Sequence, residues 1–178
     1  RTAGEIITVY INGDVVTGVG TPIIVQDDGN WSYTPDVNLP DGNYEISYTV
    51  SDSNGNTSAQ SPKLNFEIDT LAPTGGSVTI IEPIADDGVI DVAEAATNIT
   101  VTGTVTIPVD ALTTVIIVTV NGQNYSATVN TAAGTWTATI PGSQFALAAG
   151  NVHVEAVFTD TAGNSSIPAI DDALYSLN

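Results

Sequence analysis

Three kinds of residue are missing or scarce in this sequence: it has no cysteine, no methionine and only two basic residues, Arg1 and Lys63. The absence of cysteine excludes a disulfide framework but does not identify the compartment. The scarcity of lysine and arginine excludes nucleic acid and anionic membrane surfaces as partners, because both are bound through clustered basic side chains. No apolar run reaches the roughly 18 residues that a membrane-spanning helix needs.

Acidic residues, by contrast, are abundant: 20 aspartates and glutamates give a formal net charge of -18 at pH 7. Such one-sided charge opposes compaction through self-repulsion unless cations neutralise it. Because 42% of the residues are hydrophobic, we nevertheless expect the chain to fold. A folded, acidic chain that is almost free of bases indicates surroundings rich in divalent cations or salt. We also expect a fragment of something longer, because Arg1 begins in the middle of a pattern.

The periodic stretches alternate apolar with polar residues and are rich in valine, isoleucine and threonine, which predicts an all-β fold. A strand at residues 7–11 ends at Asn12-Gly13, a pair typical of a two-residue hairpin turn. Further strands are predicted at residues 44–50 and 64–68, with a short one at Trp31 and Tyr33. The helical turn that we predict covers residues 92–96.

The second half of the chain repeats the first at a spacing of about 105 to 109 residues. Residues 118–122 repeat residues 9–13, residues 134–137 repeat residues 29–32, and residues 158–165 repeat residues 50–57. Short strands separated by turns at this period indicate tandem antiparallel β-sandwiches of about 100 residues each.

The repeat divides the chain into a first unit at residues 1–69, a linker at residues 70–76 and a second unit at residues 77–178. Pro73, Gly75 and Gly76 give the linker the composition of a domain boundary. In the second unit we expect seven strands, lettered A to G, at residues 77–81, 98–105, 114–120, 123–129, 135–140, 151–159 and 167–176. The first unit begins at strand C, so we expect an incomplete sandwich that is less stable or is completed by something outside this sequence.

One acidic stretch, residues 85–94, reads like the second half of an EF-hand calcium loop. Six positions of that pattern are filled in order by Asp87, Gly88, Val89, Ile90, Asp91 and Glu94. Pro83 and Ala85 stand where the first two carboxylates belong, so the stretch alone cannot supply the roughly six to eight oxygens that Ca2+ takes. The missing ligands would come from elsewhere, and Asp86 is the nearest. The stretch fits equally well an acidic surface loop that begins a short helical turn.

The ordered set of repeat motifs resembles the bacterial immunoglobulin-like (Ig-like) tandem repeats of giant surface adhesins. The motifs are Val-Asn-Gly at 120–122, Gly-Thr-Trp at 134–136, Thr-Asp-Thr-Ala-Gly-Asn-Ser at 159–165 and Ile-Asp-Thr-Leu-Ala-Pro-Thr at 68–74. Residues 86–95 are similar to the opening of repeats in the extender region of repeats-in-toxin (RTX) adhesins. The resemblance covers nearly the whole second unit and most of the first.

This resemblance implies a calcium-stiffened extender module of an extracellular adhesin on a bacterial cell surface, serving cell adhesion or biofilm formation. Its implied cofactor is Ca2+, and its implied partners are neighbouring Ig-like repeats of the same chain. We expect a monomer without direct membrane contact. Adhesins of this kind also carry split domains interrupted by a ligand-binding insertion, which would account for the strands that the first unit lacks.

The expected topology gathers acidic side chains at the ends of each sandwich, because consecutive antiparallel strands reverse direction. Asp110 and Asp160 of the second unit are expected at the end that faces the linker and Asp69. Without a cation these carboxylates repel one another, and with Ca2+ they become ligands. We predict that Asp69 and Asp160 share a calcium ion, whereas Asp36 and Asp41 are turn residues. The complete set of predicted metal ligands is Asp69, Asp86, Asp87, Val89, Asp91, Glu94 and Asp160.

Signals of catalysis are few, and we predict no enzyme. His153 is the only histidine, it is expected to face solvent, and neither a zinc set nor a nucleophilic triad can be assembled around it. Trp31 and Trp136 recur at the same repeat position, which favours a place in the core over a sugar-binding platform.

Two classes of function remain. The first is a structural spacer whose only ligand is calcium. The second is a module that binds a sugar, a peptide or ice, or a split domain near the adhesin tip. A face for ice or sugar needs a flat array of threonines or an aromatic-lined groove. The threonines here alternate within strands as ordinary sheet-surface residues, which favours the spacer.

Overall fold

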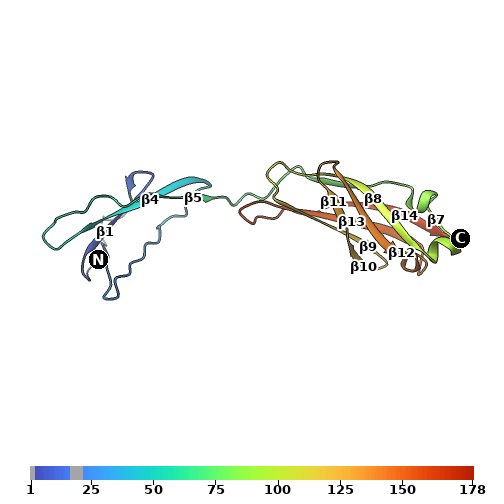
Figure 1. Ribbon diagram of the computed structural model, residues 1–178, viewed down its shortest axis with the longest axis horizontal. Coiled ribbons are helices and arrows are strands. Elements are labelled where there is room, and N and C mark those ends of the chain that lie inside the picture. The colour runs from blue at the N-terminus through green and yellow to red at the C-terminus, as the bar shows by residue number, and fades with distance from the viewer. Residues whose placement is uncertain (1–2, 17–21) are drawn as a thin grey trace. The chain divides into compact units, whose positions relative to one another are not determined.

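Antiparallel β-sheets make up nearly all of the regular structure, which confirms the predicted all-β fold class. The structure is a computed structural model that describes residues 3–16 and 22–178. The chain divides into two units, Arg1–Thr70 and Leu71–Asn178, called unit 1 and unit 2 below (Figure 1). Within the described residues, no helix is long and apolar enough to cross a membrane.

Unit 1, as far as it is described, is built on one five-stranded sheet. The strands lie in the order β2 (Asp14–Val15), β1 (Ile6–Ile11), β4 (Gly42–Ser51) and β5 (Leu64–Ile68), and β3 (Ile23–Ile24) also pairs with β1. Asn12 and Gly13 have φ angles of 52° and 89°, so they form the predicted two-residue turn between β1 and β2. The longer strands predicted for this unit are confirmed.

Apolar residues on one face of this sheet form a small core. Ile7, Val9 and Val25 are buried there, and half-buried side chains pack against them. Trp31 is one of these, and its ring meets Tyr48 edge-on with the centroids 5.3 Å apart. The short strand predicted at Trp31 and Tyr33 is wrong, because residues 25–41 contain no strand.

Unit 2 is a sandwich of two sheets (Figure 1). One sheet has the order β10 (Gln123–Ser126), β9 (Thr113–Val120), β13 (Gly150–Thr159), β14 (Ala169–Leu177) and β7 (Val89–Ile90). The other has the order β11 (Thr128–Asn130), β12 (Thr135–Pro141), β8 (Asn98–Thr106) and β6 (Ser77–Ile80). Short helical turns lie between strands: η1 (Ile84–Asp86), α1 (Val92–Ala95) and α2 (Gly142–Phe145).

The predicted strands A, B, C, E, F and G correspond to β6, β8, β9, β12, β13 and β14, with ends that differ by at most about two residues. Strand D, predicted as one strand at residues 123–129, is two strands. The chain leaves β10 at Ala127, whose N–H donates to the Ile116 carbonyl, and passes to β11 in the other sheet. The helical turn predicted at residues 92–96 is confirmed by α1.

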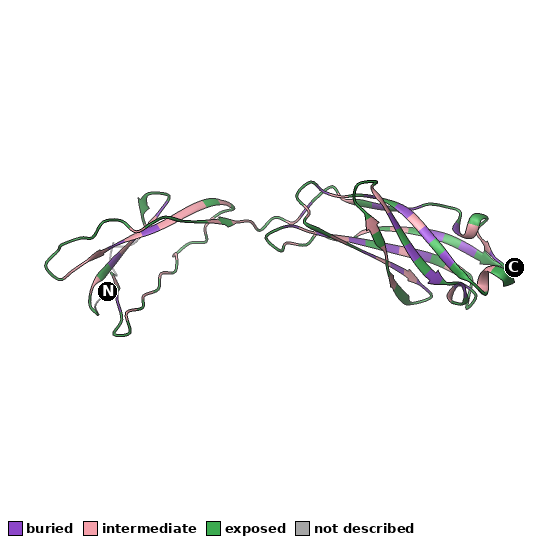
Figure 2. Cartoon of the chain, viewed as in Figure 1, coloured by how far each residue is buried: buried purple, intermediate pink, exposed green. Residues whose placement is uncertain are grey.

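Buried residues from both sheets of unit 2 form one hydrophobic core. Figure 2 marks the buried positions along the strands. Trp136 is 1% exposed, and its indole N–H donates to the carbonyls of Thr79 and Thr104 at 3.1 and 3.2 Å. The ring is thereby held against β6 and β8, which confirms the predicted core role. Gly103 on β8 makes room for it: a Cβ at this position would lie 1.9 Å from the Thr79 carbonyl oxygen and 2.4 Å from the Trp136 ring.

Unit 1 differs from unit 2 in the strands that would form a second sheet. The strands β1, β4 and β5 are the counterparts of β9, β13 and β14, whereas the described residues of unit 1 contain no counterpart of β6 or β8. In unit 2, Trp136 lies on a strand because β12 pairs with β8. Trp31 lies in residues 25–41, which contain no strand. The described residues of unit 1 thus form fewer strands than unit 2, and the incompleteness of the first unit stays a prediction.

The start of unit 2 is tied to its core. Pro73 is buried, and Gly76 lies against Phe158. A Cβ at Gly76 would be 2.2 Å from the Phe158 ring, so only glycine allows this close approach. Bending of the chain at Gly76 would break this contact. The composition of residues 70–76 indicates a domain boundary but gives no sign of the contact with Phe158.

Candidate metal centre

The predicted calcium-loop stretch lies at the end of unit 2 where Asn178 also lies (Figure 1). Its strand β7 runs parallel to the end of β14: the Ser176 N–H donates to the Gly88 carbonyl at 2.9 Å, and the Asn178 N–H donates to the Ile90 carbonyl at 3.2 Å. Ile84 and Ile90 are buried and anchor the stretch to the core of unit 2. The main chain of the loop is therefore held in place, while its aspartates stay exposed.

The backbone turns sharply before β7, with positive φ angles at Ala85 (52°), Asp86 (68°) and Gly88 (81°). In a parallel ladder, alternate residues use their backbone groups for pairing. Because Gly88 and Ile90 accept hydrogen bonds from β14, the carbonyl of Val89 lies on the opposite edge of β7. The Val89 N–H donates to Asp87 Oδ1 at 2.8 Å on that same edge. The structure thus places the Asp87 carboxylate at the N–H group of Val89, another of the predicted ligand residues.

Asp91 and Glu94 form a capping box at the start of α1. Asp91 Oδ1 accepts hydrogen bonds from the N–H groups of Ala93 and Glu94, both at 2.8 Å, and Glu94 Oε2 accepts from the Asp91 N–H at 3.0 Å. An N-cap of this kind stabilises a helix start by about 1 kcal/mol. These two acids therefore have a structural role of the sort expected from an acidic surface loop that begins a helical turn.

The geometry of the loop fits part of a calcium site. Asp86 and Glu94 line one surface depression of about 390 Å³ beside β8, and Asp87 and Asp91 are not among its lining residues. Within the described residues, no three histidine or acidic side chains are grouped closely enough to hold a metal ion by themselves. The donors are nevertheless all oxygens, which suits Ca2+, and both capping bonds of Asp91 use Oδ1 alone. Any Ca2+ bound here would need further oxygens from outside this set.

Asp160 closes the loop between β13 and β14. It is 5% exposed, and its Oδ1 and Oδ2 accept hydrogen bonds from the backbone N–H and the side-chain amide of Asn164 at 2.8 and 2.9 Å. Asp52 closes the matching loop of unit 1 in the same way, through Asn54 and Asn56. The repeat of Asp-x-x-Gly-Asn at both positions is the sequence signal for this loop-closing role, and metal binding by Asp160 stays a prediction.

These hydrogen bonds favour the charged form of both aspartates. Burial by itself raises the pKa of Asp160, but the bonds from Asn164 and the neighbouring backbone outweigh it, so the pKa lies below its ordinary value. The side-chain and backbone bonds from Asn56 likewise lower the pKa of Asp52. With so few basic residues in the chain, neutral N–H donors stabilise these carboxylates.

The remaining predicted acids are divided between the units. Asp69 follows β5 directly and is half-buried in unit 1, whereas Asp160 belongs to unit 2, so their common site stays a prediction. Asp41 accepts a hydrogen bond from the Thr70 hydroxyl at 2.9 Å, which is consistent with the predicted structural role. In unit 2, the Leu112 N–H donates to the Thr159 carbonyl at 2.8 Å, so the loop that carries Asp110 lies beside the Asp160 loop.

His153 lies on the outer face of β13, as predicted from its alternation with Val152 and Val154. Its Nδ1 is 2.8 Å from Asp172 Oδ1, and its Nε2 is 3.4 Å from Glu155 Oε1. The hydrogen bond with Asp172 raises the pKa of His153 above its ordinary value. The imidazole thus has a carboxylate at each nitrogen.

Comparisons with known proteins agree with this fold. Residues 1–70 match the family model described as bacterial Ig-like domain. One similar solved structure is that of a Ca2+-stabilised adhesin that helps an Antarctic bacterium to reach out and bind ice. It is 26% identical at a TM-score of 0.65, and the match covers 99% of this chain and 41% of that chain. The Ig-like adhesin resemblance is confirmed. No curated protein matches the chain.

Two further solved structures support the Ig-like assignment. One comes from a 1.5-MDa bacterial ice-binding adhesin that is retained at the host cell surface. It is 26% identical at a TM-score of 0.63, and the match covers 100% of this chain and 54% of that chain. The other is a bacterial immunoglobulin-like domain of the M. primoryensis ice-binding adhesin, 28% identical at a TM-score of 0.52, over 60% of this chain and 100% of that domain. This chain spans 41% and 54% of the lengths of the first two structures.

Replacing Asp160 with alanine is expected to destabilise unit 2 at neutral pH and much less in acid. Because the folded-state pKa of Asp160 lies below its ordinary value of 3.8, the carboxylate contributes stability above that value and loses it as the pH falls through the folded-state pKa. Thermal unfolding of wild type and Asp160→Ala in EDTA, between about pH 2 and pH 7, measures this effect.

The difference in Tm should be greatest above about pH 5 and should shrink toward pH 2. Asp110→Ala, on the neighbouring loop, is the matched control and should change Tm little at any pH, because Asp110 is exposed. A Tm loss in Asp160→Ala that stays constant down to pH 2 would contradict the role given to the carboxylate.

Proposed function

We propose that this chain is an extender module of a large bacterial cell-surface adhesin, located outside the cell and flanked by further Ig-like repeats of the same polypeptide. The observation that carries the proposal is the similarity over 99% of the chain to a solved adhesin at a TM-score of 0.65. The tandem repeat of one fold supports it, since each repeat adds length to a quasi-linear array. In this role the module holds a ligand-binding tip away from the cell, for adhesion or biofilm formation, and performs no catalysis.

The strand pairing of unit 2 suits a module that carries tension. A pull on its two ends loads β6, the first strand, and β14, the last. The Ile80 N–H on β6 donates to Asp171 Oδ2 on β14 at 2.8 Å, which links the two strands across the sandwich. The short parallel ladder between β7 and β14 adds backbone hydrogen bonds at the far end of β14. These bonds must shear together, rather than open one after another, when the ends are drawn apart.

Calcium is the ligand that we propose for this module. Ca2+ would supply positive charge to a chain with a formal net charge of -18, and its preference for oxygen ligands suits aspartate, glutamate and main-chain carbonyls. At the end of unit 2, Asp86 and Glu94 would bind it from their common depression, with Asp87, the Val89 carbonyl and Asp91 as the other candidates. The remaining oxygens would come from the repeat that follows.

Calcium is expected to raise the thermal stability of the chain well above what an equal ionic strength of NaCl achieves. A ligand that binds only the folded state, at about 100 times its dissociation constant, adds roughly 2.7 kcal/mol to the free energy of unfolding. Melting in EDTA, in CaCl2 and in NaCl of matched ionic strength measures the difference. Equal shifts in both salts would reduce the effect to charge screening and would contradict specific binding.

We also propose that Asp69 and Asp160 share a calcium ion that restricts the angle between the two units. Both follow the last residue of a long strand, and the loop of Asp160 lies at the end of unit 2 where Pro73 and Gly76 pack. The low pKa of Asp160 keeps it anionic at neutral pH, as a calcium ligand must be.

The shared ion predicts that Ca2+ narrows the range of interdomain conformations in solution, and that Asp69→Asn removes this effect. An amide keeps one oxygen but loses the negative charge, so it weakens the site while each unit stays folded. Small-angle X-ray scattering in Ca2+ and in EDTA tests this, with Asp36→Asn as the matched control. If wild type has the same maximum dimension in both solutions, the units are fixed by packing and the shared ion is wrong.

The threonines of unit 2 bear on the alternative of an ice-binding or sugar-binding face. On the outer face of one sheet, threonines lie directly opposite one another in the pairs Thr79–Thr104, Thr104–Thr135, Thr102–Thr137 and Thr100–Thr139. The array is more regular than the sequence suggested. However, the hydroxyls of Thr79 and Thr104 bond each other at 2.6 Å, and threonine is common on strands for its β propensity alone. We therefore retain the extender role.

A further inference from the structure

Asp172 determines which nitrogen of His153 carries the proton. The two residues lie directly opposite each other on β14 and β13, and His153 Nδ1 is 2.8 Å from Asp172 Oδ1. An ionised carboxylate can only accept a hydrogen bond, so Nδ1 is the nitrogen that donates to it. The side-chain amide of Asn151 donates to the same oxygen at 2.7 Å and holds the carboxylate in place. The neutral imidazole therefore presents its Nε2 as an unprotonated lone pair.

This lone pair faces a second carboxylate. Glu155 stands two residues after His153 on β13, so both side chains lie on the same face of the sheet, and Glu155 Oε1 is 3.4 Å from Nε2. On β9, the other neighbour of β13, the residue opposite His153 is the uncharged Thr119. Two acceptors that face each other repel unless a cation lies between them. That cation is either a proton, which gives imidazolium, or a metal ion.

The separation of the two acceptors fits a tetrahedral metal ion. Zn2+ binds imidazole nitrogen at about 2.0–2.1 Å and carboxylate oxygen at about 2.0–2.2 Å, so two such ligands at the tetrahedral angle lie about 3.4 Å apart. His153 Nε2 and Glu155 Oε1 already have this separation. The two side chains are 30% and 50% exposed, so an ion reaches them without any opening of the fold.

Asp172 stands where a carboxylate commonly supports a metal-binding histidine. A hydrogen bond at the far ring nitrogen fixes the orientation of the ring and makes the near nitrogen a more basic ligand. Calcium prefers oxygen ligands, whereas an imidazole nitrogen favours zinc and the related transition metals. The arrangement around His153 is thus chemically distinct from the acidic loop at residues 85–94.

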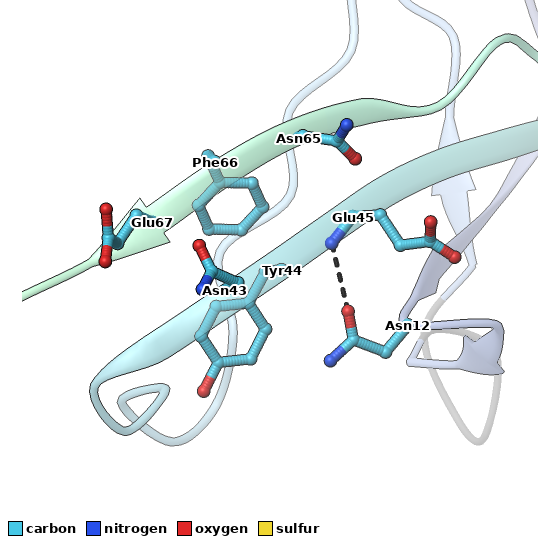
Figure 3. Close-up of a pocket in the computed structure, with 7 residues that line it drawn as sticks. All are labelled: Asn12, Asn43, Tyr44, Glu45, Asn65, Phe66 and Glu67. Atoms are coloured by element: carbon cyan, nitrogen blue, oxygen red, sulfur yellow. Dashed lines mark hydrogen bonds between the residues drawn. The ribbon is translucent and has the colours of Figure 1, made fainter.

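Unit 1 has other residues at the corresponding positions. On β4, the counterpart of β13, Glu45 holds the repeat position of His153. Figure 3 shows Glu45 on β4 and Asn65 on β5; the two are ladder partners, as His153 and Asp172 are in unit 2. Glu45 forms an ion pair with Lys63. The nitrogen ligand therefore belongs to unit 2 and is not a feature of the repeated fold.

We propose that His153 and Glu155 form a binding site for a transition-metal ion such as Zn2+, with Asp172 as the positioning residue. The ion is bound by Nε2 of His153 and the carboxylate of Glu155, and its other positions are open to water or to a ligand from another molecule. The sequence offers no complete zinc set, and this site is not one, because the chain supplies two ligands and leaves the rest open. The inference goes beyond the extender role, which needs no nitrogen ligand.

Zinc binding is measured on the full chain by NMR, because a single histidine gives one set of imidazole signals. The titration is run in excess CaCl2, so that sites made of oxygen ligands hold calcium. At about pH 7.5 we expect ZnCl2 to shift the imidazole signals of His153 in a saturable way. At about pH 5.5 the affinity should be lower, because a proton competes for Nε2 and metal binding must displace it.

Three variants separate this site from unspecific binding of zinc to carboxylates. Asp172→Asn should weaken zinc binding about tenfold, because it removes the charge behind the ring. Glu155→Gln should weaken binding by at least as much, because it removes a ligand. Glu67→Gln, at an exposed position of unit 1, is the matched control and should bind zinc as wild type does. Thermal unfolding in EDTA reports that each variant is folded.

The proposal is overturned if zinc leaves the imidazole signals of wild type unchanged. It is equally overturned if Glu155→Gln binds zinc as tightly as wild type, since His153 would then bind the ion alone. Imidazole shifts of the same size when CaCl2 is added without zinc would also contradict it, because the site would not select for a nitrogen-preferring ion. Wild-type affinity in Asp172→Asn would overturn the positioning role.

Discussion

A β-sheet with one apolar face needs a second layer over that face, and most of this structure follows from how that need is met. Unit 2 meets it with a complete second sheet, so its strands are long, its tryptophan is buried and its loops are fixed at both ends. Unit 1 meets it in part. There the Trp31 segment packs on β1 as coil, while Tyr44, Ile46 and Phe66 are only half-buried and Leu64 is 66% exposed.

Charge is the second constraint, because the chain has almost no basic side chains to balance its carboxylates. Several aspartates are satisfied by N–H donors instead: Asp160 and Asp52 close loops, Asp91 caps α1, and Asp171 accepts from the backbone of β6. Such bonds favour the ionised forms of Asp160 and Asp52 but leave the repulsion between the carboxylates in place. A divalent cation would remove part of that repulsion, which is why the extender role and calcium belong together in this account.

The strands of unit 2 could be predicted from the sequence because alternation and turn residues are local signals. What the sequence did not reveal depends on partners far along the chain. Trp31 and Tyr33 have the composition of a strand, yet residues 25–41 contain no strand. Residues 123–129 read as one strand, yet the chain changes sheets at Ala127. The pairing of β7 with β14 joins residues almost 90 positions apart, which no local pattern shows.

The candidate site was predicted less completely than the fold, for a related reason. The acidic stretch at residues 85–94 was recognisable, and the structure places Asp86 and Glu94 in one depression. The loop-closing role of an aspartate depends on its nearby donors, however, and Asp160 accepts hydrogen bonds from the backbone N–H and the side-chain amide of Asn164, four residues on. The same Asp-x-x-Gly-Asn spacing at Asp52 was the available clue to this use.

Calcium binding by the loop at the end of unit 2 is measured most directly by titration calorimetry of Ca2+ into the chelator-treated chain at physiological salt. Glu94→Gln is the variant to compare, because glutamine preserves the capping box while removing the charge. We expect saturable binding in wild type and one site fewer, or clearly weaker binding, in Glu94→Gln. Binding that is identical in the two proteins, or absent from wild type, would contradict it.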